Sequence, residues 1–292
     1  MSAPKTVIGL IQTAAGGSLE TQLLKTAERI KSASQAGARV ICLQELCCLP
    51  YFCRECREDF FDLAETVPGP TIRFFSDLAR QLEVVVIVPF FEKRDEGIYH
   101  NSAAVIDADG TLMGLYRKMH LPNDPFFYEK FYFAPGDLGF RVFETRYGTF
   151  GVLICWDQWF PEAARLAALQ GAQILFYPSA IGWHDLEDAA ERQVQLEAWQ
   201  VVQRGHAIAN EVFVAAVNRV GSEGPLTFWG TSFATDPFGK VLGRASATEE
   251  QNLIVECDFA RIAEVRRSWP FFRDRRADAY QGLQRRFIGP PE

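Results

Sequence analysis

Short hydrophobic runs alternate along this chain with longer stretches in which apolar residues recur at helical spacing. The runs predict strands, and they cover residues 7–11, 40–43, 84–88, 102–106, 112–116, 149–154, 174–177 and 212–217. Strand signals that alternate with helix signals are typical of an α/β fold.

Four stretches predict helices, at residues 18–37, 70–82, 161–171 and roughly 189–209. Ser18 is a good N-cap, and Gly37 suits a left-handed helix end. Pro70 and Pro161 each suit a first helical turn, where the missing N–H is no loss. The boundaries of these helices are therefore marked by the residues themselves.

Two turn signals show that the sheet is mixed. The sequence DADG at residues 107–110 and DPFG at residues 236–239 both predict hairpins, which join antiparallel strands. No linker rich in proline, glycine or serine and no internal repeat divides the chain. We therefore predict a single domain over residues 1–292.

Composition excludes several classes of protein. The 292 residues are 48% hydrophobic, which is too apolar for a disordered chain, and 30 basic against 37 acidic side chains give a net charge of −7, which disfavours a nucleic-acid partner. The apolar run at 84–91 is too short to cross a membrane, and the run at 7–11 is too short for a secretion signal. Seven scattered cysteines favour a reducing compartment, so we expect a cytoplasmic protein.

Four of the cysteines lie close together, at positions 47, 48, 53 and 56. The two-residue gap between Cys53 and Cys56 resembles that of a zinc knuckle. A second ligand pair with suitable spacing is missing, so the favoured interpretation is small side chains that fill a core beside a functional loop.

Three of the predicted strands end at side chains that can take part in catalysis. In residues 147–162 a buried strand is followed by Cys155 and then by a turn and a helix. Glu45 ends the hydrophobic run VICLQ, and Lys118 ends a hairpin strand in YRKMHLP. Together they supply a nucleophile, a carboxylate base and a cation, the three roles that thiol chemistry on a carbonyl requires.

In these motifs the chain resembles the nitrilase, or carbon–nitrogen hydrolase, superfamily, whose triad is Glu, Lys and Cys. LQEL, YRKMHLP and GVLICWDQWFPEAAR match its three motifs in order, and the resemblance runs from Ile8 to Arg276. It implies a four-layer αββα sandwich with mixed sheets, a covalent thiol mechanism, no metal or organic cofactor, and a homodimer or larger homo-oligomer. It also implies a carboxyl-terminal arm at about residues 265–292.

Within the superfamily, several segments are similar to the N-carbamoylputrescine amidohydrolase branch, among them PYFC, EKFYF, CWDQWFPE, YPSAIG and FRDRR. The resemblance implies cleavage of the ureido C–N bond of N-carbamoylputrescine, with Glu45, Lys118 and Cys155 as the triad. Glu129 matches a second glutamate near the triad, which could otherwise be a surface ion-pair partner. The main-chain N–H of Trp156 would help to hold the oxyanion.

Further binding residues are less clearly marked. Tyr51 matches a tyrosine that lines the site in the family, and it could otherwise belong to the core. His120 lies two residues after the triad lysine, where a structural histidine is an equal alternative. The branch usually carries a small residue and a glutamate after AIG, whereas this chain has Trp183, His184 and Asp185. We expect Asp185 to accept the distal ammonium group, with Glu187 and Asp188 in reserve.

Two other functions remain as alternatives. A different N-carbamoyl compound, such as N-carbamoyl-β-alanine, or another linear amide would use the same triad, although an acid would call for an arginine clamp that the sequence does not clearly offer. A non-catalytic scaffold is disfavoured because all three triad positions are intact. The basic and aromatic stretch at residues 266–276 is interpreted as an arm or subunit contact and not as a site for nucleic acid.

Overall fold

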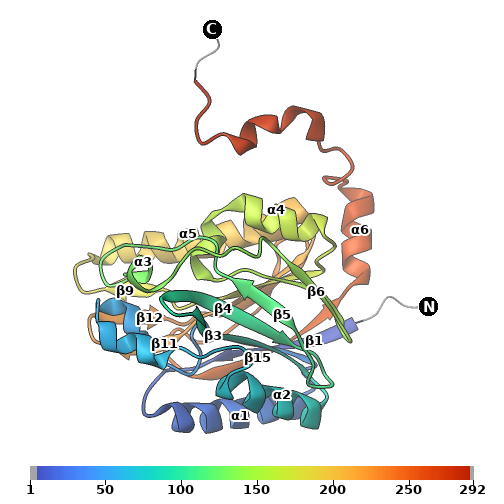
Figure 1. Cartoon of the computed structure of the whole chain (residues 1–292). Helices are drawn as coiled ribbons and strands as arrows, with labels where there is room; N and C mark the ends of the chain where they lie inside the picture. Colours follow the sequence, from blue (N-terminus) through green and yellow to red (C-terminus); the bar gives the residue numbers. More distant parts are fainter. Residues whose placement is uncertain (1–4, 290–292) are drawn as a thin grey trace.

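Two six-stranded sheets lie face to face, and helices cover the outer surface of each (Figure 1). The structure is a computed structural model that describes residues 5–289. The four layers are those of an αββα sandwich, so the predicted fold class is confirmed. The predicted single domain also includes residues 1–4 and 290–292, which lie outside the described residues.

The first sheet has the strand order β15-β1-β2-β3-β4-β5. Its central strands β1, β2 and β3 are parallel, and antiparallel neighbours complete both edges. The strands are β1 Lys5–Gln12, β2 Val40–Leu43, β3 Val85–Asp95, β4 Ile98–Ile106, β5 Leu112–Arg117 and β15 Gln251–Asp258.

The second sheet repeats this plan, with the order β14-β13-β10-β8-β7-β6 and the parallel strands β7, β8 and β10 in its centre. Its strands are β6 Val142–Thr145, β7 Gly148–Val152, β8 Ile174–Pro178, β10 Phe213–Val217, β13 Phe233–Thr235 and β14 Val241–Arg244. The parallel strands of both sheets end beside the same region, where side chains from the two sheets can meet.

A third, small sheet borders that region. It has the order β11-β12-β9 and consists of β9 Gly182–His184, β11 Val220–Glu223 and β12 Leu226–Trp229. Gly182 is needed for this pairing because a Cβ there would lie 2.3 Å from the main-chain oxygen of Thr227.

The helices are α1 Leu19–Gln35, α2 Pro70–Leu82, α3 Glu129–Tyr132, α4 Pro161–Leu169, α5 Ala189–Asn210 and α6 Ala260–Ser268. The first two cover one sheet, and α4 and α5 cover the other (Figure 1). Short 3-10 helices are η1 Phe52–Arg54, η2 Glu58–Leu63, η3 Cys155–Trp159, η4 Ala277–Ala279 and η5 Gln281–Gln284. Within the described residues, no helix combines the length and apolarity that a membrane span requires.

Burial on both faces explains why the central strands are hydrophobic throughout. In β2, Val40 and Cys42 belong to the core between the sheets, whereas Ile41 and Leu43 face the core under α1 and α2. Because successive side chains of a strand point to opposite faces, a strand covered on both sides needs apolar residues at every position.

Every predicted strand run and all four predicted helices have a counterpart in the structure. The hairpin turns at 107–110 and 236–239 are confirmed, since they join the antiparallel pairs β4–β5 and β13–β14. The predicted helix stripe on α1 is also present, with Ala27 and Ile30 buried. The pattern did not predict β6, β9, β11, β12, β15 or α6.

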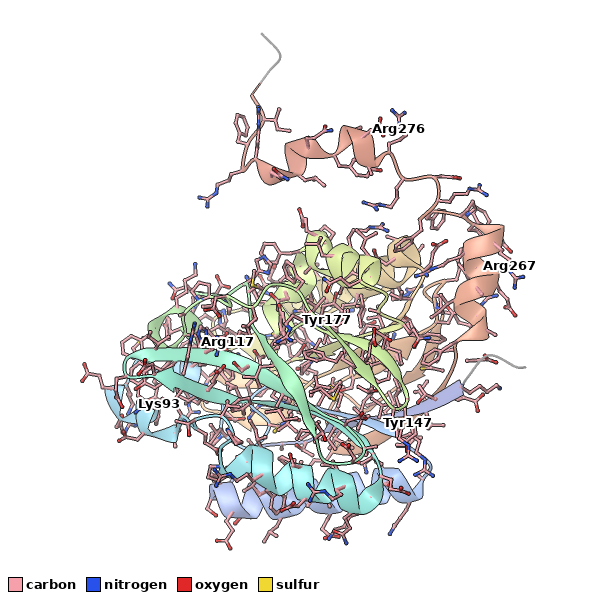
Figure 2. The ribbon with its side chains drawn as sticks, turned by 45° about the vertical axis from the view of Figure 1, so that its right-hand side comes forward. Lys93, Arg117, Tyr147, Tyr177, Arg267 and Arg276 are labelled. Atoms are coloured by element: carbon pink, nitrogen blue, oxygen red, sulfur yellow. The ribbon has the colours of Figure 1, made fainter. Side chains whose placement is uncertain are left out.

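Beyond α6 the chain leaves the sandwich, as Figures 1 and 2 show. Arg276 lies on this outer segment, whereas Tyr177 of β8 lies within the body (Figure 2). Large apolar side chains of the segment are exposed, among them Phe287 at 81%. The segment occupies the place expected for the arm, and the described part of that arm ends at residue 289.

The helical layer offers a matched test of the packing. Leu78 of α2 is buried in the outer core, whereas Leu24 of α1 is 55% exposed. We predict that Leu78→Ala lowers the free energy of unfolding by about 2–5 kcal/mol, since it removes contacts and leaves a cavity. Leu24→Ala should change it by less than about 0.5 kcal/mol. Urea denaturation of both variants measures this, and equal losses would contradict the layer assignment.

Candidate active site

The predicted triad residues converge from both sheets. Glu45 follows β2, Lys118 follows β5 directly, and Cys155 opens η3 after β7. All three are buried, with exposures of 4% or less. The structure therefore brings together the three strand ends that the sequence marks.

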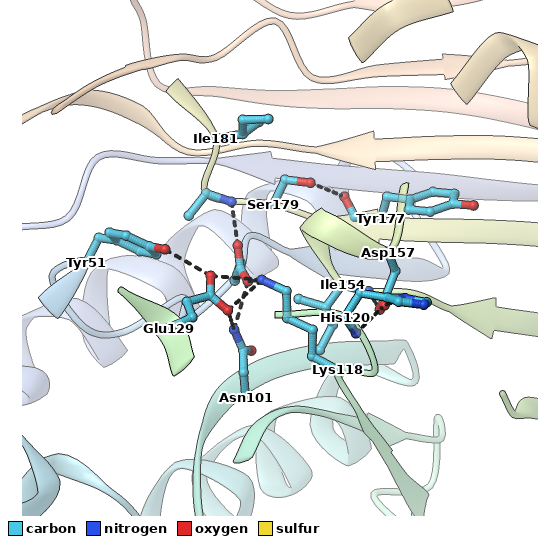
Figure 3. A network of polar contacts seen from close by, with 12 residues as sticks. Tyr51, Asn101, Lys118, His120, Glu129, Ile154, Asp157, Tyr177, Ser179 and Ile181 are labelled. Atoms are coloured by element: carbon cyan, nitrogen blue, oxygen red, sulfur yellow. Dashed lines mark hydrogen bonds and ion pairs between the residues drawn. The ribbon is translucent and has the colours of Figure 1, made fainter. Parts of the chain in front are cut away.

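Lys118 is the centre of the polar network in Figure 3. Its Nζ donates to Oε1 of Glu45 at 2.7 Å and to both carboxylate oxygens of Glu129 at 2.8 and 2.7 Å. Burial alone would lower the pKa of Lys118, but the charges of Glu129 and Glu45 outweigh it and hold the pKa well above its usual value. The lysine is therefore a fixed cation.

Glu45 is held by three donors. Besides the lysine, Asn101 donates its Nδ2 to Oε1 of Glu45 at 2.8 Å, and the main-chain N–H of Ala180 donates to Oε2 at 2.8 Å. The asparagine comes from β4 and the alanine from the loop after β8. One carboxylate is thus oriented by groups from both sheets.

Glu129 is buried and not the exposed surface partner that was the alternative, since it is 1% exposed. The hydroxyl of Tyr51 donates to its Oε1 at 2.9 Å (Figure 3). Burial and the nearby charge of Glu45 raise the pKa of Glu129 to about 7, although Lys118 and Tyr51 pull it down. Tyr51 is also fully buried, and its hydrogen bond helps to fix the position of this carboxylate.

Cys155 has a backbone conformation that few non-glycine residues adopt, with φ at 43°. Burial raises the pKa of its thiol, Glu45 raises it further, and Lys118 lowers it, with a net pKa well above the usual value. The resting thiol is therefore neutral, and it needs a proton acceptor before it can act as a nucleophile.

The turn that carries Cys155 is fixed by Asp157, which sequence analysis did not single out. Its Oδ2 accepts from the hydroxyl of Tyr116 at 2.6 Å and from the N–H of Ile154 at 2.9 Å. Its Oδ1 accepts from the N–H of His120 at 3.0 Å. The position of Asp157 two residues after the cysteine in CWDQWF was the available signal.

His120 contacts neighbouring protein side chains and does not lie at the cavity beside Cys155, as in the structural alternative to a contact with substrate. Its ring Nδ1 lies 2.7 Å from Oδ1 of Asp157 (Figure 3), and its ring stacks on Phe160 with 3.6 Å between centroids. The ring does not line the cavity next to Cys155, which differs from the expected contact with substrate. The continuation of the strand beyond Lys118, on which that expectation depended, is absent because β5 ends at Arg117.

A cavity of about 340 Å³ opens beside Cys155. Its walls are largely apolar and aromatic, and they include Phe127, Trp156, Trp159, Ile181 and Trp229. Its charged groups are the carboxylates of Asp124, Glu129, Glu187 and Glu191. Among the described residues, no lysine or arginine lines it.

Asp185, which we expected to accept the ammonium group of the substrate, does not lie at the cavity. Asp185 is exposed and is not part of the cavity lining, because β9 ends at His184 and the next residues turn outward. Glu187, which was held in reserve, does line the cavity, and Glu191 joins it from the first turn of α5. Asp188 is instead the N-cap of α5.

The other departures from the family pattern also have structural explanations. Trp183 donates its indole N–H to the main-chain oxygen of Arg192 at 2.9 Å and packs on Trp229, so it lies behind the cavity wall. His184 lines the cavity and pairs with Glu187, with 3.2 Å between Nε2 and Oε1. The bulky indole therefore supports the cavity without filling it.

The cysteine cluster at 47–56 packs into two cores. Cys47 and Cys48 belong to the core under α1 and α2, Cys53 belongs to an aromatic core near Tyr51, and Cys56 is exposed. Over residues 5–289, no three His, Cys, Asp or Glu side chains are arranged to hold a metal ion.

Comparisons with known proteins show which proteins this chain is similar to. A family model described as carbon-nitrogen hydrolase matches residues 7–267. An N-carbamoylputrescine amidase of Solanum lycopersicum is 47% identical over 268 residues, which are 88% of each chain. A citrullinase of Francisella tularensis is 40% identical over 96% of this chain and 98% of its own length. The crystal structure of a carbon-nitrogen hydrolase from Helicobacter pylori G27 superposes with a TM-score of 0.94 at 46% identity, over 97% of this chain and 100% of that one.

The raised pKa of Glu129 predicts a dependence of stability on pH. A carboxyl group whose pKa rises from 4.5 to about 7 on folding stabilises the protein below pH 4.5, and this contribution is lost as the pH rises to about 7. Across that window, the free energy of unfolding of the unsubstituted protein should fall by roughly 3 kcal/mol relative to Glu129→Gln. Urea denaturation at several pH values measures it, with the exposed Glu197→Gln as the control. Parallel pH curves for the unsubstituted protein and Glu129→Gln would contradict the shift.

Proposed function

This chain belongs to the carbon–nitrogen hydrolase family, and from that premise we propose that it cleaves the ureido C–N bond of N-carbamoylputrescine to give putrescine, ammonia and carbon dioxide, a step of polyamine biosynthesis. The relative from Solanum lycopersicum, which bears the name of this activity, is 47% identical to the chain. The observation that carries the proposal is the cavity beside Cys155, whose charged side chains include four carboxylates and, among the described residues, no lysine or arginine.

The first step is attack by sulfur on the ureido carbon. Glu45 accepts the thiol proton of Cys155, which is neutral at rest, and a C–S bond forms as the carbonyl oxygen becomes an oxyanion. Lys118 and the main-chain N–H of Trp156 stabilise that oxyanion. The terminal C–N bond then breaks, and ammonia leaves with the proton that Glu45 had taken.

The second step releases the product. Water, deprotonated by Glu45, adds to the carbamoyl thioester, and the C–S bond breaks to regenerate Cys155. The released carbamic acid loses carbon dioxide and leaves putrescine. Every group in this cycle belongs to the chain, the substrate or water.

Glu129 and Tyr51 act through Lys118. Because both oxygens of Glu129 accept from the lysine, the ammonium group cannot leave its position beside Glu45 without losing two charge-assisted hydrogen bonds. Tyr51 in turn fixes one of those oxygens. We therefore assign Tyr51 a supporting role, and not the contact with substrate expected from the sequence.

The remainder of the cavity suits a tetramethylene chain that ends in an ammonium group. The aromatic and apolar walls can cover the methylene groups, and Glu187 and Glu191 lie where a cation could be bound. Glu187 is already engaged by His184 and Gln195, whereas no ion pair among the described residues involves Glu191. A substrate carboxylate, as in N-carbamoyl-β-alanine, would meet like charge here.

A homo-oligomer and a cytoplasmic location remain predictions. The exposed apolar side chains of α4 and α5 support self-association, and they include Leu166, Leu169, Val194 and Val201. Apolar patches of this kind are common at subunit contacts.

The thiol mechanism predicts that Cys155→Ala lowers kcat for ammonia release from N-carbamoylputrescine by at least about 10³-fold, since no other group forms the thioester. The matched control is Cys257→Ala, another buried thiol, which lies in β15 far along the chain from the triad. It should keep kcat within about twofold. Hydrolysis that survives in Cys155→Ala would rule the mechanism out.

The acidic end of the cavity predicts an effect on substrate binding. Glu191→Gln should raise KM for N-carbamoylputrescine by about two- to fivefold with a smaller change in kcat, because it weakens a solvent-exposed contact remote from the reacting carbon. Glu197→Gln, on the same helix but not in the lining, is the control. N-carbamoyl-β-alanine and citrulline complete the assay panel. Turnover of N-carbamoyl-β-alanine equal to that of N-carbamoylputrescine would contradict selection for an amine.

A further inference from the structure

Arg219 is a buried cation that the proposed mechanism does not use. It lies just before β11, and its side chain is 0% exposed. Removing a guanidinium from water is costly unless its N–H groups are paired, so its partners indicate what it is for. They lie on two segments, the loop after β2 and the far end of β11.

One nitrogen of this guanidinium donates to three main-chain oxygens of the loop that carries Glu45. Its Nη2 donates to the main-chain oxygens of Glu45 at 3.1 Å, Leu46 at 3.1 Å and Leu49 at 3.0 Å. Leu46 has a left-handed backbone with φ at 49°, a conformation that costs energy for a leucine. The arginine thus holds a strained turn at the residue that follows the proposed base.

The other terminal nitrogen of Arg219 is connected through Glu223 and Tyr51 to Glu129, the second carboxylate of the site. Nη1 of Arg219 donates to Oε1 of Glu223 at 2.6 Å, and Oε2 of Glu223 accepts the main-chain N–H of Tyr51 at 2.6 Å. The hydroxyl of Tyr51 is the group that donates to Glu129. Hydrogen bonds therefore connect the ion pair of Arg219 and Glu223 both to the loop that carries Glu45 and, through Tyr51, to Glu129.

We infer that Arg219 and Glu223, here called the clamp, are positioning residues that set the geometry of both carboxylates around Lys118. The clamp touches neither the cavity nor the reacting atoms and acts through main-chain groups. This inference rests on the proposed function, because it assigns the clamp a role in the same reaction.

The chemistry of arginine makes the clamp specific. Its planar fork presents two nitrogens in fixed directions, so a single side chain can reach Glu223 and three carbonyl oxygens at once. A lysine has one nitrogen and cannot serve both directions. Arg219→Lys therefore keeps the charge and removes the geometry.

The first test is Arg219→Lys in the full-length protein. We expect kcat for ammonia release to fall by about 10- to 100-fold while KM changes by less than about threefold, because displacement of the base weakens catalysis more than binding. Alkylation of Cys155 by iodoacetamide, followed at the peptide level by mass spectrometry, should slow by about tenfold. Arg29→Lys, which disturbs an ion pair with Glu250 in the outer layer, is the control and should change neither rate.

The second test is Glu223→Gln, which also decides the matter if Arg219→Lys does not fold. Glu129 is faced by Lys118, Glu45 and Tyr51, and the hydrogen bond from Tyr51 lowers its pKa. Both oxygens of Glu129 hold Lys118 only while the carboxyl is ionised, so the acidic limb of the kcat profile should follow the protonation of Glu129. Loosening Tyr51 should therefore move that limb to higher pH by about half a unit or more. A loss of folded protein alone would lower kcat equally at every pH.

The outcomes separate the clamp from the proposed function. If Glu223→Gln keeps the unsubstituted kcat and pH profile, and folded Arg219→Lys does as well, the clamp is overturned. If the unsubstituted protein releases no ammonia from N-carbamoylputrescine, the proposed substrate is wrong, and the alkylation rate of Cys155 still tests the clamp because it needs no substrate.

Discussion

The burial of one positive charge organises this molecule. Lys118 lies fully inside the protein, where an unpaired ammonium group would be prohibitively costly, so two carboxylates must accompany it. Those carboxylates carry a net negative charge that must in turn be satisfied, which Asn101, Tyr51 and the N–H of Ala180 accomplish. Groups from both sheets are therefore committed to one cation before any substrate binds.

Much of the fold was predictable because its signals are local. The strands with both faces buried are unbroken apolar runs, and the helix starts carry Ser18, Pro70 and Pro161. The strands that were missed are mostly short or half-exposed. β9 has three residues, β11 and β12 have four each, and β15 alternates buried and partly exposed positions over part of its length. In such strands, pairing with distant neighbours decides the conformation, and the local pattern is weak.

The site was predictable where chemistry and motif coincide, and it was not where geometry decides. Glu45, Lys118 and Cys155 stand at strand ends within motifs, so their convergence followed from the topology. Four of the seven residues at positions 185–191 are acidic. Which of them faces the cavity depends on where β9 ends and α5 begins, and the sequence alone could not show that. Asp157 was marked only by its position two residues after the cysteine, and the main-chain oxygens that Arg219 binds leave no trace in the sequence.

The site lies across the boundary between the two sheets. Glu45 and Lys118 belong to one sheet, whereas Cys155 and the N–H of Ala180 that holds Glu45 belong to the other. The apolar side chains packed between the sheets, such as Val40 and Phe176, thereby act as a spacer that sets the distance from base to nucleophile. If the core between the sheets were thicker or thinner, the rate of turnover would fall before the fold was lost. The side chains of this core are therefore constrained in volume as well as in polarity.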